Sequence, residues 1–252
     1  MQVEWSARDG DAVTKGTRFG TVFGSTRSLL VAERLVLNLM QRMSGIATAT
    51  SLFVRTMSAP HTRLLDTRKT VPGLRMLDKL AVRHGGGYNH RVGLYDMCLI
   101  KDNHIEAAGG VEKAVAGART YLSELAAIGK GTQANGAPIE VEVEARTMDE
   151  VRAVLACGTK QVQRVLLDNM VKFDASSGSV DTSMLQEALE IIRAHTAAQP
   201  AGEARLQTEA SGNVNLRTVA AIGATGVDFV SVGALTHSVM AMDISMKIKL
   251  GQ

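Results

Sequence analysis

From Arg63 onward, short apolar runs alternate with stretches of helical periodicity, and this alternation constrains the fold more than any other feature. Alternating strands and helices pair as right-handed βαβ units on a parallel sheet. Six or seven such units predict an α/β fold, built as an incomplete (β/α) TIM-like barrel. An open doubly wound sheet is the alternative, although no GxGxxG or Walker-type glycine loop is present to favour it.

The expected elements follow directly from this pattern. Apolar runs predict strands at Arg63–Asp66, Met97–Lys101, Ile139–Glu144, Arg164–Asp168, Arg205–Glu209 and Asp228–Val232. Helical spacing predicts helices at Leu74–Val82, Gly110–Ala127, Met148–Ala156, Ser183–Thr196 and Leu216–Ile222.

The first part of the chain has a different pattern. Glycines recur between short apolar pieces over Arg8–Ser25, which predicts a small β meander with glycine turns. Ala32–Met57 then predicts one long helix. Gly45 interrupts its apolar stripe, which helices tolerate at a cost of about 1 kcal/mol. Arg42, on this helix, is expected to be structural.

Composition excludes several classes of function. The formal net charge of the 252 residues is only +3 and aromatic residues make up 4%, so nucleic acid is an unsuitable partner. Cys98 and Cys157 are far apart, which suits a reducing compartment rather than a disulfide framework. The apolar runs are too short to span a membrane, and Met1–Asp11 does not resemble a signal peptide. We therefore expect a cytoplasmic protein without a membrane partner.

Polar residues repeatedly follow the predicted strands. In a parallel barrel the carboxyl ends of the strands share one face, and active sites lie on that face. The last two strand ends carry small residues, which suits phosphate binding by backbone N–H groups. The polar segments are Asp66–Lys69, Lys101–His104, Asp168–Asn169, Ser211–Asn213 and Gly233. This face is the expected site.

Three carboxylates share one face of the strand Ile139–Glu144, because Glu140, Glu142 and Glu144 alternate with apolar residues. This face could belong to a solvated edge strand. In a barrel it would point inward, where an unpaired carboxylate is costly and needs a cation or a metal. With Asp168 on the neighbouring strand, two carboxylates at one mouth would suit Mg²⁺ carried by a phosphorylated substrate.

Cations dominate the rest of the predicted mouth. Like charges this close repel each other unless an anion neutralises them. The alternative is that they pair with Asp66, Asp78, Asp96 and Asp102. If they do not, the substrate is a polyanion, or two anions bind together. The cations are Arg68, Lys69, His90, Arg91 and Lys101.

At this point the residues carry a family resemblance. The segments DTRKTVPGLR, GGGYNHRVGLYDMCLIKDNHI, EVEVEA, VLLDN, EASGNVN and FVSVGALTHS resemble quinolinate phosphoribosyltransferase, also called nicotinate-nucleotide pyrophosphorylase (carboxylating). The resemblance implies a small N-terminal open sandwich, shortened here to residues 1–32, before an α/β barrel over residues 33–252. Helix 33–57 would link the two. The short N-terminal part leaves open whether upstream residues are needed.

The resemblance also implies a reaction. Quinolinate would attack phosphoribosyl pyrophosphate through its ring nitrogen, and pyrophosphate and CO₂ would leave to give nicotinate mononucleotide, a step towards NAD. The alternatives are a related phosphoribosyltransferase that uses another heterocyclic acid, and a barrel that binds nucleotides or phosphates without turnover.

Residue roles are implied as well. Lys69, Lys101, Glu142 and Asp168 would be catalytic, with Glu142 and Asp168 holding Mg²⁺ directly or through water. Substrate would be bound by Arg34, Arg68, His90, Arg91, Lys101, Ser211, Gly212, Gly233 and His237. Arg34 would act across the interface of a homodimer or higher homo-oligomer. Apart from the resemblance, His104 lies beside Asp102 in the sequence and is expected to support its neighbours without touching substrate.

Overall fold

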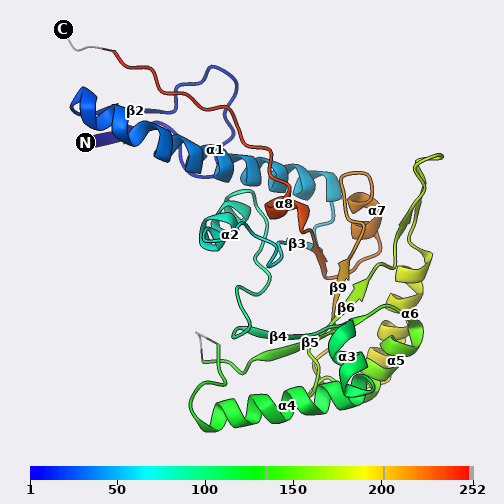
Figure 1. Cartoon of the computed structure of the whole chain (residues 1–252). Helices are drawn as coiled ribbons and strands as arrows, with labels where there is room; N and C mark the ends of the chain where they lie inside the picture. The colour runs from blue at the N-terminus through cyan, green and yellow to red at the C-terminus, as the bar shows by residue number, and fades with distance from the viewer. Residues whose placement is uncertain (134–135, 201, 250–252) are drawn as a thin grey trace.

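The computed structural model describes residues 1–133, 136–200 and 202–249, so the last three residues of the predicted barrel domain lie outside it. Its centre is a six-stranded, wholly parallel sheet in the order β3-β10-β9-β6-β5-β4 (Figure 1). The strands are β3 (Arg63–Leu65), β4 (Met97–Ile100), β5 (Glu140–Ala145), β6 (Arg164–Asp168), β9 (Gln207–Ser211) and β10 (Phe229–Ser231).

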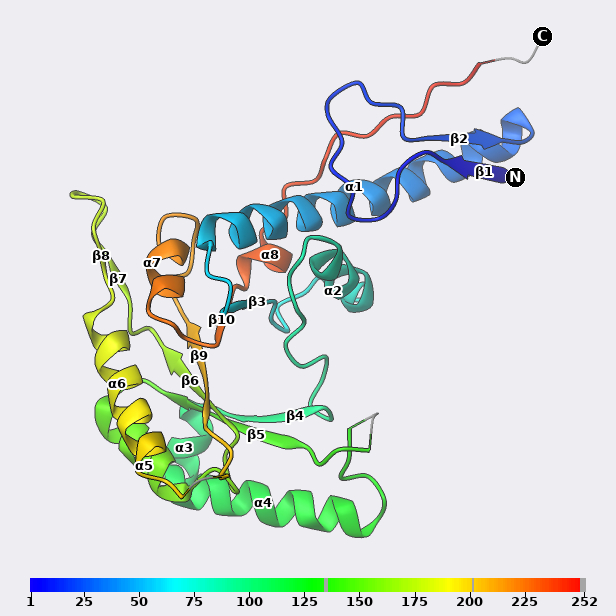
Figure 2. The same ribbon diagram turned by 180° about the vertical axis from the view of Figure 1, so that it is seen from behind.

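The sheet curls into a barrel that stays open on one side. The open side lies between β3 and β4, which are consecutive in sequence but form the two edges of the sheet. Tyr88 extends the β3 edge, because its N–H donates to the Leu64 carbonyl at 2.8 Å and its carbonyl accepts the Asp66 N–H at 3.1 Å. The following residues cross towards β4 (Figure 2). The predicted incomplete barrel is confirmed, and the open doubly wound alternative is wrong.

Helices cover the outside of this sheet. They are α1 (Thr26–Met57), α2 (Arg75–His84), α3 (Asp102–Ala108), α4 (Val111–Ala127), α5 (Met148–Cys157), α6 (Ser183–Ala197), α7 (Val219–Ala224) and α8 (Ala234–His237). The short helices α3 and α8 are absent from the prediction. Helix α1 begins earlier than predicted because Ser25 caps it, its side chain accepting the Ser28 N–H. None of the helices described here has the length and apolarity needed to cross a membrane.

Two small hairpins accompany the barrel. Near the N-terminus, β1 (Gln2–Trp5) pairs antiparallel with β2 (Gly20–Phe23). The predicted meander over Arg8–Ser25 is therefore wrong, since only β2 falls within it and the partner strand precedes it. The second hairpin, β7 (Lys172–Phe173) with β8 (Val180–Asp181), follows β6 and is also absent from the prediction.

The two faces of the sheet differ sharply in polarity. Along β5, Val141 and Val143 point outward into the hydrophobic core that the helices cover, together with Val165 and Leu167 of β6. The alternate residues face the barrel interior. Glu142 has no exposed surface there, and β5 lies between β4 and β6. The solvated-edge interpretation of this strand is therefore wrong.

Helix α1 fastens the C-terminal segment to the barrel. The Met242 N–H donates to the Gln41 carbonyl at 3.0 Å, and the Gln41 side-chain amide donates to the Ile244 carbonyl at 2.8 Å. Gly45 permits this approach, because a Cβ there would lie 2.2 Å from the Met240 carbonyl oxygen. The presence of Gly45 in the helix is thus explained by the C-terminal segment, which crosses α1 at Met240.

The structural role expected for Arg42 is clear from its contacts. Its guanidinium forms two bonds of 2.8 Å to the Asp78 carboxylate on α2, and it also donates to the Thr236 carbonyl of α8 at 3.0 Å. Asp78 is fully buried. One side chain therefore holds α1, α2 and α8 together.

We predict opposite effects for alanine at two helical glycines. Gly45→Ala should lower the free energy of unfolding, because the new methyl group displaces the Met240 segment. Gly117→Ala in α4 is the matched control, since no atom lies within 4 Å of its Cβ position. It should raise the free energy of unfolding by about 0.5–1 kcal/mol through helix propensity. Urea denaturation measures both, and equal effects would contradict the steric explanation.

Candidate active site

Four of the predicted site residues meet at the carboxyl ends of β4, β6 and β9. The Lys101 ammonium lies 2.6 Å from Oε2 of Glu144, which points inward from β5. Direct strand pairing places Asp168 opposite Ser211, and the Asn169 N–H donates to the Ser211 carbonyl at 2.9 Å. Gly212 follows with φ +83°, where only glycine fits without strain.

The positive charges near Asp168 do not fully offset its burial and the negative charge of Glu144. Burial and the neighbouring Glu144 raise its pKa, against the opposing effects of Lys101 and of a hydrogen bond from Ser211. Two carboxylates with one lysine between them suit a hard divalent cation, which prefers oxygen ligands. The residues at this point therefore fit Mg²⁺, with Glu144 rather than Glu142 beside Asp168.

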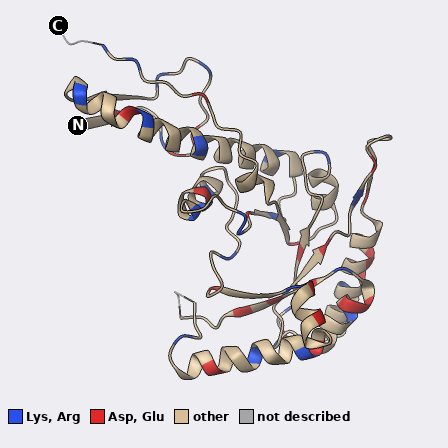
Figure 3. Ribbon diagram, in the orientation of Figure 1, with Lys and Arg blue, Asp and Glu red and all other residues tan. Residues whose placement is uncertain are grey.

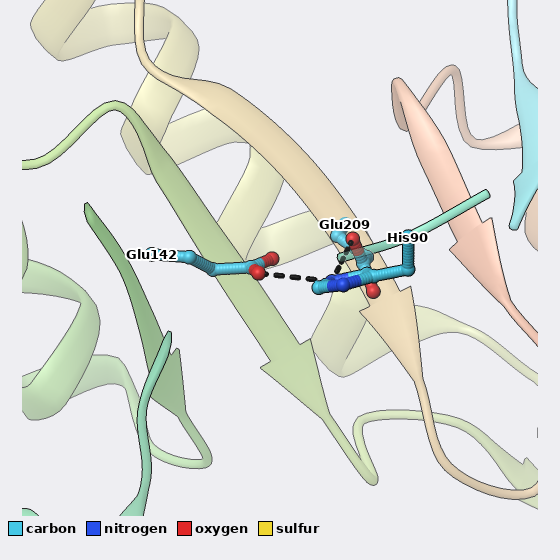
Figure 4. A group of neighbouring side chains, drawn as sticks. All are labelled: His90, Glu142 and Glu209. Carbon is cyan, nitrogen blue, oxygen red and sulfur yellow. Dashed lines mark ion pairs between the residues drawn. The ribbon is translucent and has the colours of Figure 1, made fainter. Parts of the chain in front are cut away.

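Glu142 belongs to a different, deeper group (Figure 4). Its Oε2 lies 3.0 Å from Nε2 of His90, and Oε2 of Glu209 lies 3.3 Å from the same nitrogen. Both carboxylates are completely buried. Burial and the charge of Glu209 raise the pKa of Glu142. The three side chains also lie close enough to hold a metal ion.

Arg68 and Arg91 form a positive pair. Burial and the charge of Arg68 lower the pKa of Arg91, whose Nη1 donates to the Met97 carbonyl at 3.3 Å. One guanidinium nitrogen of Arg68 is buried and has no hydrogen-bond partner among the described residues. Two guanidinium groups held this way can receive a carboxylate or phosphate group.

The acidic residues expected as alternative partners of these cations are engaged elsewhere. Asp66 binds Lys79, Asp78 binds Arg42, and Asp102 binds Arg146 at 3.2 Å. Asp96 accepts the N–H groups of the turn that follows Arg91. The alternative, in which these carboxylates pair with the cations of the mouth, is therefore wrong for Asp66, Asp78 and Asp102, whereas the charge of Asp96 still raises the pKa of Arg91.

A buried ion pair holds the segment that carries His90 and Arg91. The Lys79 ammonium lies 2.6 Å from Oδ1 of Asp66, and both side chains are at most 1% exposed. Asp66 also accepts the Asn89 side-chain N–H at 2.7 Å and the His90 backbone N–H at 2.8 Å. Lys79 donates in addition to the His90 carbonyl at 3.1 Å. The backbone of His90 is thus held in place by the buried Asp66–Lys79 ion pair.

A second part of the site lies at the end of β10. A Cβ on Gly233 would lie 3.1 Å from the His237 ring and 3.3 Å from Cδ of Lys69. Thr236 fixes the Lys69 backbone, since its hydroxyl donates to the Lys69 carbonyl at 2.8 Å. Lys69, Gly233 and His237 are therefore brought together. Nδ1 of His104 accepts the Lys101 N–H at 2.9 Å, and its supporting role stays a prediction.

Arg34 is not brought to this site within the chain. It lies on the N-terminal half of α1, where its side chain is 65% exposed and pairs with the adjacent Glu33 at 3.0 Å. Its predicted role would need a second subunit and stays a prediction.

Sequence reasoning missed Glu209 and Arg164 as interior residues. The Arg164 guanidinium donates to Oε2 of Glu209 at 3.2 Å and lies 4.1 Å from the centroid of the Phe229 ring. The signal was available, because Glu209 and Ser211 have the same period-two relation as Glu142 and Glu144.

Comparison with known proteins agrees with this geometry. Residues 46–247 match the family model for the quinolinate phosphoribosyl transferase C-terminal domain, and residues 1–44 match the model for the N-terminal domain. The chain belongs to the quinolinate phosphoribosyltransferase family. The family resemblance is thereby confirmed. The two models meet inside α1, and the predicted boundary at residue 32 stays a prediction.

Several individual relatives are similar over nearly the whole chain. This chain is 52% identical to quinolinate phosphoribosyltransferase [decarboxylating] 2b, mitochondrial, of Nicotiana tabacum, and the alignment covers 98% of this chain and 65% of that protein. It is 49% identical to the chloroplastic nicotinate-nucleotide pyrophosphorylase [carboxylating] of Arabidopsis thaliana, covering 98% and 66%. The crystal structure of NadC from Streptococcus pyogenes superimposes with a TM-score of 0.78 at 35% identity, covering 98% and 74%.

The chain therefore spans about two thirds of the length of these curated plant relatives. Their names place them in mitochondria or chloroplasts, so the cytoplasmic location expected here stays a prediction.

We predict that Lys79→Met destabilises this family member strongly. The substitution leaves the Asp66 carboxylate buried without its cation, which should cost about 3–5 kcal/mol in the free energy of unfolding. Adding Asp66→Asn should recover part of that loss, because the neutral amide no longer needs a buried cation. Urea denaturation of both variants is the measurement, and a double variant no more stable than Lys79→Met would contradict the assignment.

Proposed function

We propose that this chain transfers phosphoribosyl from phosphoribosyl pyrophosphate to quinolinate with decarboxylation, giving nicotinate mononucleotide, pyrophosphate and CO₂. The observation that carries this proposal is the pair Arg68 and Arg91. The charge of Arg68 acts on Arg91 in this quinolinate phosphoribosyltransferase family member, and among the described residues neither guanidinium has an ion-pair partner. A pyridine dicarboxylate supplies two negative charges to such a pair.

Quinolinate would lie between these arginines and Lys101. Arg68 and Arg91 bind its carboxylates through their planar forks, and the Lys101 ammonium contributes a point charge. His90 borders the same pocket, but both of its ring nitrogens face protein groups. We assign it to holding this side of the pocket.

The phosphoribosyl donor would lie along the other strand ends. Ser211, Gly212 and Gly233 offer small residues for the 5′-phosphate at the ends of the last two strands, the place where barrels bind phosphate. His237 and Lys69 lie beside Gly233. Lys69 is thereby positioned to stabilise the negative charge of the donor and of the departing pyrophosphate.

The reaction needs no side-chain nucleophile. Loss of pyrophosphate leaves a ribose with oxocarbenium character, and the Glu142 carboxylate stabilises that positive charge. Holding two anionic substrates together against their repulsion is a large part of the catalytic effect. Asp168, with Glu144 beside it, would hold Mg²⁺, which supplies positive charge to the pyrophosphate. After transfer, the cationic ring nitrogen accepts the electrons released with CO₂.

A second copy of the chain is the proposed partner. Leu30, Val31 and Leu35 of α1 are all more than half exposed, and they flank Arg34 in sequence. Large apolar side chains gathered on one exposed helix suit a protein–protein contact. We propose a homodimer or higher homo-oligomer in which Arg34 reaches the site of the neighbouring subunit.

The activity is tested directly by product formation. The purified chain is incubated with Mg²⁺, phosphoribosyl pyrophosphate and either quinolinate or nicotinate. We expect nicotinate mononucleotide and CO₂ from quinolinate, and no product from nicotinate, whose single carboxylate leaves one guanidinium unpaired. Product from nicotinate alone would indicate the related transferase. Ligand-induced stabilisation without any product would indicate a non-catalytic barrel.

The shared site makes a further prediction about mixed subunits. Arg34→Ala and Arg91→Ala should each abolish quinolinate turnover alone. Co-expressed, they should recover part of the activity, because a hybrid dimer contains one site with both arginines intact. Each variant paired with itself is the control. Hybrid dimers that form, as shown by differential tagging, yet remain inactive would contradict the role of Arg34.

A further inference from the structure

His90 has one proton donor facing two acceptors. Its Nε2 lies 3.0 Å from Oε2 of Glu142 on β5 and 3.3 Å from Oε2 of Glu209 on β9, which approach the ring nitrogen from two different strands (Figure 4). The N–H direction is aligned on neither oxygen. Among the described residues, Nε2, both Glu142 oxygens and Oε1 of Glu209 are buried without a hydrogen-bond partner. Buried polar atoms left in this state point to a functional role.

The other ring nitrogen fixes where the proton is. The Arg91 backbone N–H donates to Nδ1 at 2.7 Å, so Nδ1 acts as an acceptor and Nε2 carries the hydrogen. The His90 backbone is held by Asp66 and Lys79. The imidazole therefore presents a fixed N–H to the two carboxylates.

The two carboxylates differ in how firmly they are held. Arg164 lies 3.2 Å from Oε2 of Glu209, and the same arginine is held by Gln207 and by the Phe229 ring. Glu142 has no ion-pair partner except His90 within the part of the chain that the structure describes. Glu209 is thus a fixed acceptor, and Glu142 is the one that can turn.

We propose that Glu209 is a positioning residue that takes the His90 N–H when Glu142 turns towards the ribose. The inference rests on the proposed function, in which Glu142 stabilises the positive sugar. Without Glu209, turning Glu142 would leave the Nε2–H buried and unbonded, which is costly. With Glu209 in place, the N–H passes from one carboxylate to the other and no buried donor is left without an acceptor.

Steady-state kinetics of three variants test this exchange. Glu209→Leu removes the second acceptor and should lower kcat by about tenfold or more, while KM for quinolinate changes little. Glu209→Gln keeps an acceptor oxygen for His90 and Arg164 and should lose only about fivefold in kcat. Glu140→Gln is the matched control, because it neutralises an interior carboxylate of β5 that has no ion pair with His90. It should leave kcat unchanged.

A double-mutant cycle tests whether Glu209 acts through Glu142 or only stabilises the fold. If Glu209 acts through Glu142, then Glu209→Leu should have no further effect on kcat in the Glu142→Gln background. An equal loss in both backgrounds, or an unchanged kcat in Glu209→Leu, would overturn the proposal. If Glu209→Leu does not fold, the same cycle is carried out with Glu209→Gln.

A spectroscopic readout does not depend on turnover. In protein labelled with ¹⁵N-histidine, the His90 Nε2–H resonance should persist in Glu142→Leu, because Glu209 then accepts the hydrogen. It should be lost to solvent exchange in Glu142→Leu/Glu209→Leu, which leaves no carboxylate to accept it. Loss already in Glu142→Leu would refute the exchange. An inactive wild-type chain with the expected resonances would instead refute the proposed function.

Discussion

The parallel pairing of β5, β6 and β9 decides where the charges of this protein lie. Period-two alternation sends valines and leucines outward to the helices and sends Glu142, Arg164 and Glu209 inward. A buried charge is tolerated only with a partner, so each interior group restricts its neighbours. The arrangement of the site follows from charge balance inside the barrel, while the apolar contacts outside it hold the strands in register.

Periodicity was sufficient to predict the six barrel strands and six of the eight described helices, because each buries one apolar side against its neighbours. It missed α8, which has only four residues, and α3, which has seven residues but buries none of them and so shows no apolar side. Strand β9 begins at Gln207 rather than Arg205, since Arg205 pairs with Asp228 outside the sheet. Glycine spacing indicated turns near the N-terminus but could not identify β1 as the partner of β2.

The sequence predicted which residues belong to the site, but not which of their side chains lie next to each other. Strand ends and the family resemblance select Lys101, Glu142 and Asp168, yet the register between strands decides which of them meet. Lys101 faces Glu144, and Glu142 faces a histidine from a segment across the open side of the barrel. No local pattern contains that information. Lys79 was hidden for the same reason, because an amphipathic helix gives no sign that one of its lysines pairs inside the protein.

Two pairs of neighbouring charges show why a dianion suits this site. Asp66 and Lys79 neutralise each other, so their burial supports the fold and leaves nothing for a ligand. Arg68 and Arg91 have the same sign and repel each other; burial and the charge of Arg68 lower the pKa of Arg91, against the opposing charges of Glu142 and Asp96. A ligand with one carboxylate removes only part of that repulsion, whereas a ligand with two can pair each guanidinium. Discrimination between one and two carboxylates therefore follows from the number of uncompensated cations, before shape is considered.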